Sequence, residues 1–140
     1  MTTFEGRTAL VTGASGGIGR RIAERLAAAG ATVALHYSSN AEPADELASA
    51  LPKAAAFGAD LGDAEAPDRL VDEVEAAFGR VDVLVANHGR SQIARLEQVD
   101  AAAFDEMIAV NLRAPFLLAR RTLPGMADRV AAQGGTLAID

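Results

Sequence analysis

Three glycines near the N-terminus have a spacing that suits a phosphate-binding turn. Gly13, Gly17 and Gly19 form the pattern G-x-x-x-G-x-G, after a short apolar run over residues 8–11 and at the start of a helical pattern. Glycine lets the backbone adopt positive φ and approach a ligand without a Cβ atom in the way. The first N–H groups of the following helix have no intrahelical partner, and the helix dipole adds a partial positive charge there. The stretch therefore predicts an anion site suited to a pyrophosphate.

The spacing of these glycines separates the turn from other nucleotide-binding motifs. It is not the G-x-G-x-x-G of the commoner dinucleotide fingerprint. A P-loop is excluded, because no Gly-Lys-Ser/Thr follows and Lys53 is the only lysine of the chain. An ordinary loop that contains glycines is the alternative interpretation. The order strand, turn, helix favours the nucleotide site over that alternative.

The composition fits a globular protein and excludes several functional classes. The chain has 140 residues, 50% of them hydrophobic, a formal net charge of −6 and no cysteine. This acidic balance argues against nucleic acid or an anionic membrane as a partner. Without cysteine there is no disulfide, thiolate metal site or cysteine nucleophile, and we predict no metal site. The N-terminus lacks the apolar region of a signal peptide, and no apolar run approaches the ~20 residues of a membrane helix. We therefore expect a soluble, cytoplasmic protein.

Strands and helices alternate along the chain, as they do in a parallel sheet covered on both faces. The expected strands are residues 8–11, 32–36, 54–58 and 81–86. The expected helices between them are residues 17–29, 41–50 and 64–78. This pattern predicts an α/β fold, a Rossmann-type doubly wound parallel sheet in the strand order 3-2-1-4-5. We expect residues 1–140 to form one dinucleotide-binding domain.

The last third of the chain predicts two more helices and a fifth strand. Asp100 is a suitable cap for a fourth helix. The apolar stripe of that helix consists of Phe104, Met107, Ile108 and Leu112. A further helix is expected over residues 115–132, kinked or broken near Pro124. Residues 136–139 are expected to form the fifth strand, after which the sheet is truncated.

Polar residues follow the first four expected strands, at the edge of the sheet where ligands bind. In folds of this kind, ligands lie beyond the carboxyl ends of the strands, where the strand order reverses. The glycine-rich turn follows the first strand. The other candidates are the segment His36-Tyr37-Ser38-Ser39-Asn40, then Asp60, then Asn87-His88-Gly89. Their convergence on one crevice supports a nucleotide site more than any single motif does.

Taken together, these motifs resemble the short-chain dehydrogenase/reductase family, and within it the 3-oxoacyl-acyl-carrier-protein-reductase-like members. TGASGGIG at residues 12–19 matches the family's T-G-x-x-x-G-x-G. Ala86-Asn87-His88-Gly89 resembles the family's N-N-A-G with two departures, and Val110-Asn111-Leu112 resembles the segment that carries its helix-four asparagine. The resemblance covers essentially the whole chain. It implies an NAD(P)-dependent oxidoreductase that transfers a hydride between the nicotinamide and a small carbonyl or alcohol substrate.

The resemblance also implies roles for individual residues. The implied cofactor-binding residues are Gly13, Ser15, Gly17, Ile18 and Gly19, then His36, Tyr37 and Ser38, then Asp60 and Leu61, and finally Asn87, His88 and Gly89. Asp60 corresponds to the acidic residue that contacts the adenine. His88 stands where the family usually has a small residue close to the ribose. Asn111 corresponds to the catalytic asparagine that holds a water in the proton relay.

Asp60 and Asn111 each have a structural alternative. Asp60 could simply cap a turn, as Asp63 could cap the third helix. Asn111 lies four residues after Met107 and is expected on or beside the buried stripe of its helix, where an amide needs partners. It could instead be a core asparagine that caps a helix break near Pro115.

The two histidines can also be interpreted as residues without a functional role. A lone loop histidine is usually solvated and inert. Neither His36 nor His88 has a neighbouring carboxylate pattern for catalysis or further ligands for a metal.

The segment after the second strand favours NADP over NAD. An NAD site usually places Asp or Glu about 20 residues beyond the fingerprint, on the ribose hydroxyls. Residues 36–40 contain no carboxylate, and the first acidic residue after them is Glu42. Their hydroxyl and amide groups could accept a 2′-phosphate, which a carboxylate would repel. We therefore predict NADP, with NAD as the alternative.

The tyrosine and lysine that the family uses for proton transfer are not found in these 140 residues. The family's tyrosine donates the proton, a lysine four residues later lowers its pKa, and a serine orients the substrate. The only tyrosine here is Tyr37, and Ala41 stands four residues after it. The chain thus resembles the cofactor-binding half of the enzyme, and we expect these 140 residues to be part of a longer sequence.

Two other interpretations remain open. One is a non-catalytic dinucleotide-binding module, and the other is an inactive remnant. A complete enzyme of this family is expected to be a homo-oligomer. A sheet that ends at the fifth strand would leave an exposed edge, so we also expect the isolated chain to be marginally stable or to self-associate.

Overall fold

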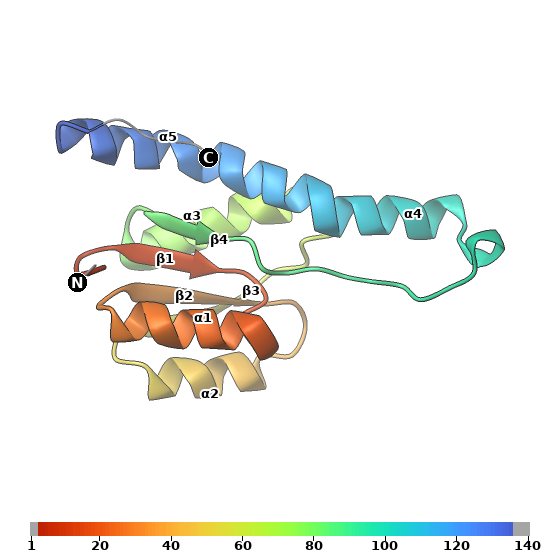
Figure 1. Cartoon of the computed structure of the whole chain (residues 1–140), viewed down its shortest axis with the longest axis horizontal. Coiled ribbons are helices and arrows are strands. Elements are labelled where there is room, and N and C mark those ends of the chain that lie inside the picture. The colour runs from red at the N-terminus through yellow and green to blue at the C-terminus, as the bar shows by residue number, and fades with distance from the viewer. Residues whose placement is uncertain (1–2, 136–140) are drawn as a thin grey trace.

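Four parallel strands form the centre of the molecule (Figure 1). A computed structural model describes residues 3–135. The strands are β1 (Thr8–Val11), β2 (Thr32–Tyr37), β3 (Ala54–Gly58) and β4 (Val83–Val85). Their order is β3-β2-β1-β4, and every pairing is parallel. The predicted α/β fold and the order of its first four strands are confirmed, whereas the fifth strand, predicted over residues 136–139, lies outside the described residues.

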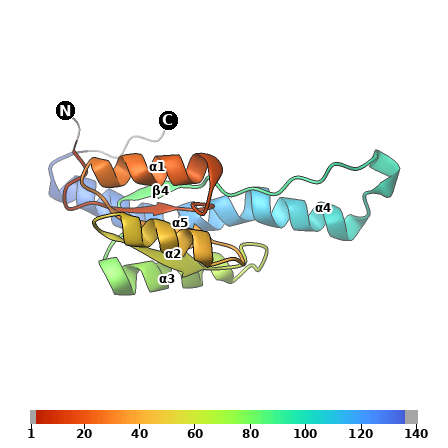
Figure 2. The same cartoon turned by 90° about the horizontal axis from the view of Figure 1, so that it is seen from below.

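Helices cover both faces of the sheet (Figures 1 and 2). Helices α1 (Gly17–Ala28) and α2 (Glu42–Ala50) pack on one face, and α3 (Ala66–Phe78) and α5 (Ala114–Ala132) pack on the other. Side chains alternate along the central strand, so Ala9 and Val11 face the first pair of helices and Leu10 faces the second. A strand buried on both faces is expected to be apolar at every position.

The segment between β4 and α5 projects beyond the sheet (Figure 1). It consists of an extended loop, a 3₁₀ turn η1 (Leu96–Gln98) and helix α4 (Ala101–Ile108). Asp100 caps α4 as predicted, since its Oδ1 accepts the N–H of Ala103 at 2.8 Å. In the described chain α4 buries none of its own residues.

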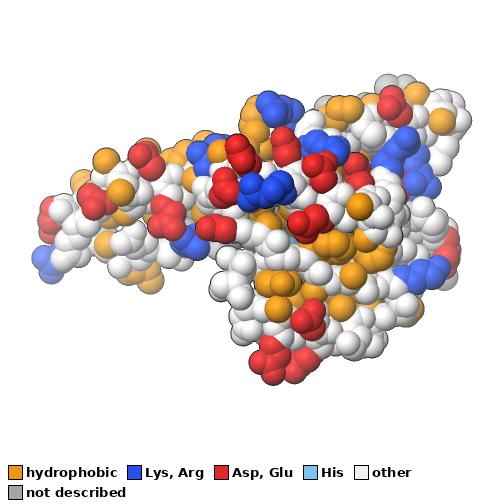
Figure 3. All heavy atoms as spheres, turned by 180° about the vertical axis from the view of Figure 1, so that it is seen from behind, with side chains coloured by type: hydrophobic (Ala, Val, Ile, Leu, Met, Phe, Trp, Pro, Cys, Tyr) orange, Lys and Arg blue, Asp and Glu red, His pale blue; other side chains and the backbone are white. Residues whose placement is uncertain are grey.

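The predicted stripe along α4 is therefore largely exposed. Phe104, Ile108 and Leu112 are 58%, 41% and 63% exposed. Figure 3 shows hydrophobic side chains on the surface of the projecting arm. The stripe stays open because no described element packs against the outer side of the arm.

A π-helical turn, η2 (Ala109–Arg113), joins α4 to α5 without a break. The N–H of Ala114 bonds to the carbonyl of Ala109, which is one residue further back than in an α-helix. Pro115 has no N–H to offer to Val110, five residues before it. The helix therefore widens at Pro115, and the carbonyl of Val110 is left for another donor.

The sequence predicted a kink or a break near Pro124. The break is wrong, because α5 continues through Pro124 to Ala132. Contacts on both sides of the proline hold the helix in place. Leu118 before it and Met126 after it both pack in the core on this face of the sheet. This packing offsets the loss of the hydrogen bond that the proline cannot make.

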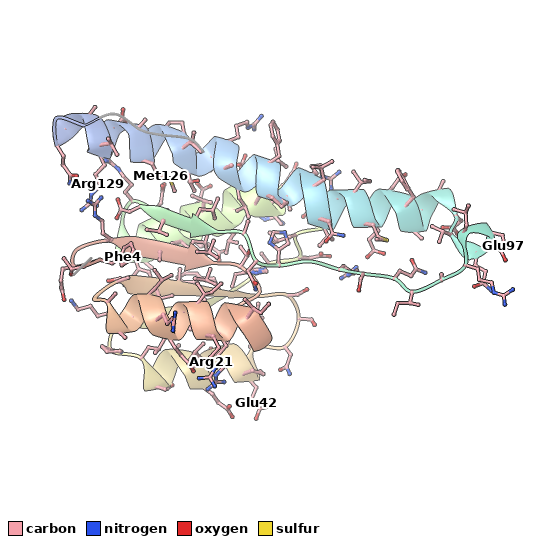
Figure 4. The ribbon with its side chains drawn as sticks, viewed as in Figure 1. Phe4, Arg21, Glu42, Glu97, Met126 and Arg129 are labelled. Carbon is pink, nitrogen blue, oxygen red and sulfur yellow. The ribbon has the colours of Figure 1, made fainter. Side chains whose placement is uncertain are left out.

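Ion pairs connect α5 to helix α3 and to the residue just before β4. Nη1 of Arg129 lies 2.7 Å from Oδ1 of Asp82, a carboxylate that is 2% exposed. Figure 4 shows the Arg129 side chain reaching from α5 toward the end of the sheet near Phe4. Arg121 pairs with Asp72 and Glu75 of α3 at 2.7 and 3.0 Å, and charges of both signs intermingle over this face (Figure 3).

Two details of the loop before α3 differ from expectation. The helix begins at Ala66, and its N-cap residue, Glu65, makes no side-chain capping bond. Asp63 does not cap the helix itself but accepts the N–H of Glu65 at 3.0 Å in the preceding turn. The bond from the N–H of Glu65 lowers the pKa of this carboxyl group, and so does the pair of its Oδ2 with Arg69 at 2.7 Å.

Within residues 3–135, no helix combines the length and the apolar character that crossing a bilayer requires.

Candidate functional site

The glycine-rich turn after β1 leaves the start of α1 open. Gly13 and Gly17 have φ of +62° and +57°, in the left-handed region that other residues rarely adopt. Gly16 precedes the helix, and no side chain in the described chain caps its first turn. The N–H groups of that turn therefore remain available to an anion. This geometry fits the pyrophosphate of a dinucleotide.

Gly19 allows α1 to start directly against the turn. A Cβ atom at this position would collide with the carbonyl oxygen of Gly13 and would lie 2.6 Å from Nδ2 of Asn87. Backbone atoms cannot move out of the way as the end of a flexible side chain can. The third glycine of the motif is thus required by packing.

Thr12 and Asn87 join the ends of β1 and β4. Nδ2 of Asn87 donates to the carbonyls of Thr12 and Gly13 at 3.2 and 3.1 Å. Oγ1 of Thr12, which is fully buried, accepts the backbone N–H groups of Asn87 and His88 at 3.1 and 3.2 Å. Sequence reasoning placed Asn87 at the cofactor but missed Thr12. A hydroxyl between a buried strand and the first glycine of the motif was the available signal.

His36 is buried and connects β2 to the glycine-rich turn. Its Nδ1 accepts the N–H of Gly13 at 3.1 Å, and its Nε2 lies 2.9 Å from the carbonyl oxygen of Ala59. Burial lowers the pKa of His36, and the positive charge of a protonated His88 would lower it further, against the raising effect of the bond to Ala59. The expectation of a solvated, inert loop histidine is wrong, because His36 lies within β2 and is 2% exposed.

His88 connects the same turn to the π-helical turn. Its Nδ1 lies 2.6 Å from Oγ1 of Thr12, and its Nε2 lies 2.8 Å from the carbonyl oxygen of Val110. That carbonyl is the one that Pro115 cannot serve. Burial lowers the pKa of His88, against the raising effect of the bond to Val110. His88 is therefore not a solvated histidine either.

Asn111 lies in the π-helical turn and is exposed. Its Oδ1 accepts the N–H of Arg90 at 2.8 Å, and its Nδ2 donates to the carbonyl of Arg90 at 2.7 Å. A Cβ on Gly89 would lie 3.3 Å from the same Oδ1. The predicted place on or beside a buried stripe is wrong, because Asn111 is exposed and the stripe of α4 is itself not covered by any described element. The amide is satisfied instead by the loop that follows β4.

The predicted residues from β2, β3 and β4 meet in one hollow at the carboxyl ends of the strands. Its lining consists of the predicted His36, Ser38, Asp60, Leu61, His88 and Gly89, together with Ala59, Arg90 and Val110. The glycine-rich turn touches this hollow through its bonds to both histidines. Gly17 and Ile18 line a separate, shallow depression on α1, and Ile18 is 73% exposed.

Three of the predicted residues also have structural roles. Oδ1 of Asp60 accepts the N–H of Gly62 at 2.9 Å, so the turn-capping alternative is confirmed for that oxygen. Leu61 is 4% exposed and packs in the core. The Tyr37 ring covers Gly58 on β3, where a Cβ would lie 2.8 Å from its hydroxyl oxygen. The ring of Tyr37 is therefore directed at the neighbouring strand.

Residues 7–138 match the family described as short chain dehydrogenase. This chain belongs to the short-chain dehydrogenase family. In the folded chain, the turn at residues 12–19 follows β1, and Asn87 follows β4.

Proteins similar to this short-chain dehydrogenase include an oxidoreductase and solved structures that contain NADPH or NADP. The chain is 40% identical over 125 residues to the uncharacterized oxidoreductase YmfI of Bacillus subtilis, covering 86% of this chain and 50% of that protein. A blue fluorescent protein from a metagenomic library, solved in complex with NADPH, superposes with a TM-score of 0.85 at 34% identity, over 91% of this chain and 54% of that one. A short chain dehydrogenase from Burkholderia cenocepacia in complex with NADP gives 0.84 at 37%, over 88% and 52%. The chain spans about half the length of these relatives.

Proposed function

We propose that this chain is the dinucleotide-binding part of an NADP-dependent oxidoreductase that acts on a carbonyl or alcohol substrate. The observation that carries the proposal is the glycine-rich turn. Gly13 and Gly17 adopt positive φ, Gly19 packs without a side chain, and the first turn of α1 is uncapped. A bound dinucleotide supplies the hydride, and the protein positions it.

The cofactor-binding roles follow the order of the strand ends. We assign the pyrophosphate to the turn with Gly13, Ser15, Gly17, Ile18 and Gly19. We assign the adenosine half to the hollow with Ser38, Asp60 and Leu61, and the ribose beside Asn87, His88 and Gly89. His36 and Tyr37 support this arrangement through the turn and through β3.

NADP is the proposed dinucleotide. Ser38 lines the hollow, and no carboxylate lies in residues 36–40 to repel a 2′-phosphate. Two structural neighbours that contain NADPH or NADP support the choice. NAD remains the competing ligand.

Asn111 is the proposed participant in proton transfer. Its side chain is held by the backbone of Arg90, which fixes the π-helical turn against the loop after Gly89. We propose that this turn holds a water in the proton relay of the complete active site. The 3-oxoacyl-acyl-carrier-protein-reductase-like subtype is the substrate class that the sequence motifs favour.

The assembly and location are proposed on separate grounds. We propose that residues 1–140 form a single unit of a homo-oligomer, because Phe104, Ile108, Leu112 and Phe116 form an exposed apolar stripe along α4, η2 and α5. The acidic, cysteine-free composition suits the reducing cytoplasm.

A non-catalytic dinucleotide-binding module is the second candidate. The observation in its favour is that these 140 residues contain no Tyr-x-x-x-Lys. Binding of NADP and its role in catalysis must therefore be measured separately.

The experiment is a calorimetric titration of the purified chain with NADP⁺ and with NAD⁺ at about pH 8. We expect saturable binding of both and tighter binding of NADP⁺. Ser38→Asp should weaken binding of NADP⁺ at least about tenfold relative to NAD⁺, since a carboxylate at the rim of the hollow repels the 2′-phosphate. Ser49→Asp, on the far side of α2, is the matched control and should leave the ratio unchanged. Tighter binding of NAD⁺ by the unmodified chain would overturn the NADP assignment.

A further inference from the structure

The only two histidines of the chain hold the same turn from opposite sides. Each directs Nδ1 at the turn, His36 at the N–H of Gly13 and His88 at the hydroxyl of Thr12. Each directs Nε2 at a backbone carbonyl of a neighbouring element, Ala59 after β3 and Val110 in the π-helical turn. The ring centroids lie 6.3 Å apart. The turn is thus tied to both of its flanks through imidazole rings.

The partners of His36 allow only one protonation state. The N–H of Gly13 can only donate, so Nδ1 must present a lone pair. The carbonyl of Ala59 can only accept, so Nε2 must carry the proton. A cationic ring would place an N–H on Nδ1 against the N–H of Gly13, 3.1 Å from the Gly13 nitrogen in the present structure.

The partners of His88 lead to the same state. The carbonyl of Val110 requires a proton on Nε2. Oγ1 of Thr12 already accepts two N–H groups, from Asn87 and from His88 itself, which fill its two lone pairs. Its hydroxyl proton has two acceptors within reach, Nδ1 of His88 at 2.6 Å and the carbonyl oxygen of Val85 at 3.3 Å, and the shorter contact is the one to Nδ1. A proton on Nδ1 would have no acceptor left at Thr12.

We propose that His36 and His88 are positioning residues of the dinucleotide site, which hold the turn at Thr12 and Gly13 in its binding conformation only while both rings are neutral. This inference rests on the proposed dinucleotide function. Neither ring belongs to the glycine motif, which is the part of the turn that we assign to the pyrophosphate. The rings act through the turn, and acidification releases it.

The charged groups around the hollow do not remove this requirement. Asp60, after β3, lines the hollow, but its Oδ1 is engaged by Gly62. Arg90, after β4, also lines it and pairs with Glu106 of α4. From the π-helical turn, Arg113 is directed at the carbonyl of Gly62. The groups closest to the two rings are therefore the backbone, Thr12 and the rings themselves.

The first test is the protonation state of the unmodified chain without ligand. Long-range ¹H–¹⁵N correlation spectra of the imidazoles at about pH 8 should show both rings in the Nε2–H form. Titration should then give both histidines pKa values below 6.5, the ordinary value. A ring in the Nδ1–H form, or a ring that titrates at or above 6.5, would overturn the proposal without reference to any cofactor.

The second test separates the two ends of each ring with conservative variants. Asparagine can offer an oxygen near the position of Nδ1, and glutamine can offer an N–H near the position of Nε2. His36→Asn and His88→Asn should therefore keep NADP⁺ binding within about threefold at about pH 8, whereas His36→Gln and His88→Gln should weaken it about tenfold. If the Gln variants bind NADP⁺ more tightly than the Asn variants, the bonds from Nε2 to the carbonyls of Ala59 and Val110 hold the turn, and the proposed role of Nδ1 is refuted.

The third readout is the pH profile of binding. Below pH 6.5, NADP⁺ affinity of the unmodified chain should fall by up to about tenfold per pH unit for each histidine. A 2′-phosphate itself titrates near pH 6, so the decisive quantity is the difference between the unmodified chain and the double Asn variant with the same ligand. Glu46→Gln, on the exposed side of α2, is the control for a distant ionisable group. Equal profiles for the chain and the double variant would refute the proposal, while absence of binding at every pH would refute the proposed function instead.

Discussion

Thr12 is the residue on which the site converges. Its single hydroxyl serves the backbone of Asn87 and His88 and the ring of His88, and it is fully buried. Unmade hydrogen bonds of buried groups cost about 1–3 kcal/mol each, so such a centre tolerates little change. The glycines that follow it, Gly13, Gly17 and Gly19, supply the space for the proposed ligand.

Gly19→Ala tests that space. Alanine is favoured over glycine by up to about 1 kcal/mol inside a helix. At this position its Cβ would meet the carbonyl of Gly13, so we expect the collision to win and destabilise the fold by about 1–3 kcal/mol. Urea denaturation measures the change.

Gly16→Ala is the matched control for Gly19→Ala. A Cβ at Gly16 meets nothing within 4 Å, and the backbone there is extended. Its stability should change by less than about 0.5 kcal/mol. If both variants lose the same stability, packing of the third glycine against the turn is not the cause.

The two histidines make stability depend on pH. Burial lowers the native pKa of both rings, so the unfolded chain binds more protons than the native chain below about pH 6.5. Their contribution is therefore complete above the unfolded pKa and is lost as the pH falls below it, by up to about 1.4 kcal/mol per pH unit for each ring. Urea denaturation at about pH 7.5 and 5.5 should show the loss. Stability that rises on acidification in this range would contradict it.

Sequence reasoning located the site residues better than it described their roles. The glycines, Asp60 and Asn87 could be placed because strand ends and motif spacing are local properties. The bonds of His36 to Gly13 and Ala59 join three strands that are distant in sequence, so no local pattern reveals them. The exposure of Asn111 was not predicted, because no local pattern reveals that the described chain leaves the stripe of α4 uncovered.

The elements were predictable where apolar periodicity is continuous. The four described strands and the three helices between them agree with their predicted ranges to within about two residues. The end of α5 at Ala132 was also predicted, but its continuity through Pro124 was not, because a proline inside a helix normally breaks it. Long-range contacts of Leu118, Met126 and Arg129 decide the outcome there.

The Arg129–Asp82 pair should contribute strongly to the seating of α5. Asp82 is buried and also accepts the N–H of Thr8 at 2.9 Å. Arg129→Met would leave this carboxylate without its cation, and we expect a loss of about 3 kcal/mol in urea denaturation. Arg69→Met, which removes an exposed pair with Asp63, is the control and should cost no more than about 1 kcal/mol. Equal losses would mean that burial of Asp82 does not set the cost.

The molecule as a whole divides into a packed body and an exposed arm. The body carries the turn and the hollow. The exposed stripe Phe104, Ile108, Leu112 and Phe116 runs along the arm and onto the start of α5, and Figure 3 shows hydrophobic side chains on the surface of the arm. An exposed apolar stripe of this kind favours association. The proposed homo-oligomer would bury it.

The double variant Leu112→Glu with Phe116→Glu tests this use of the stripe. We expect the unmodified chain to sediment as a species larger than its 14.4 kDa monomer. The double variant should raise the dissociation constant at least about tenfold, because charges in the core of an interface disfavour association. Ala50→Glu, at the end of α2, is the control. A monomeric unmodified chain would refute the homo-oligomer proposal for these residues.

The central claim is that the strand ends form one dinucleotide site, and ligand mapping by NMR tests it most directly. NADP⁺ added to ¹⁵N-labelled chain at about pH 8 should shift the amides of four segments, which are residues 13–19, 36–40, 60–61 and 87–89. The amides of α2 and of the last turns of α5 should stay in place. Saturable shifts confined to those segments are the predicted result. Shifts that cluster on the arm, or no saturable shifts at all, would contradict the account.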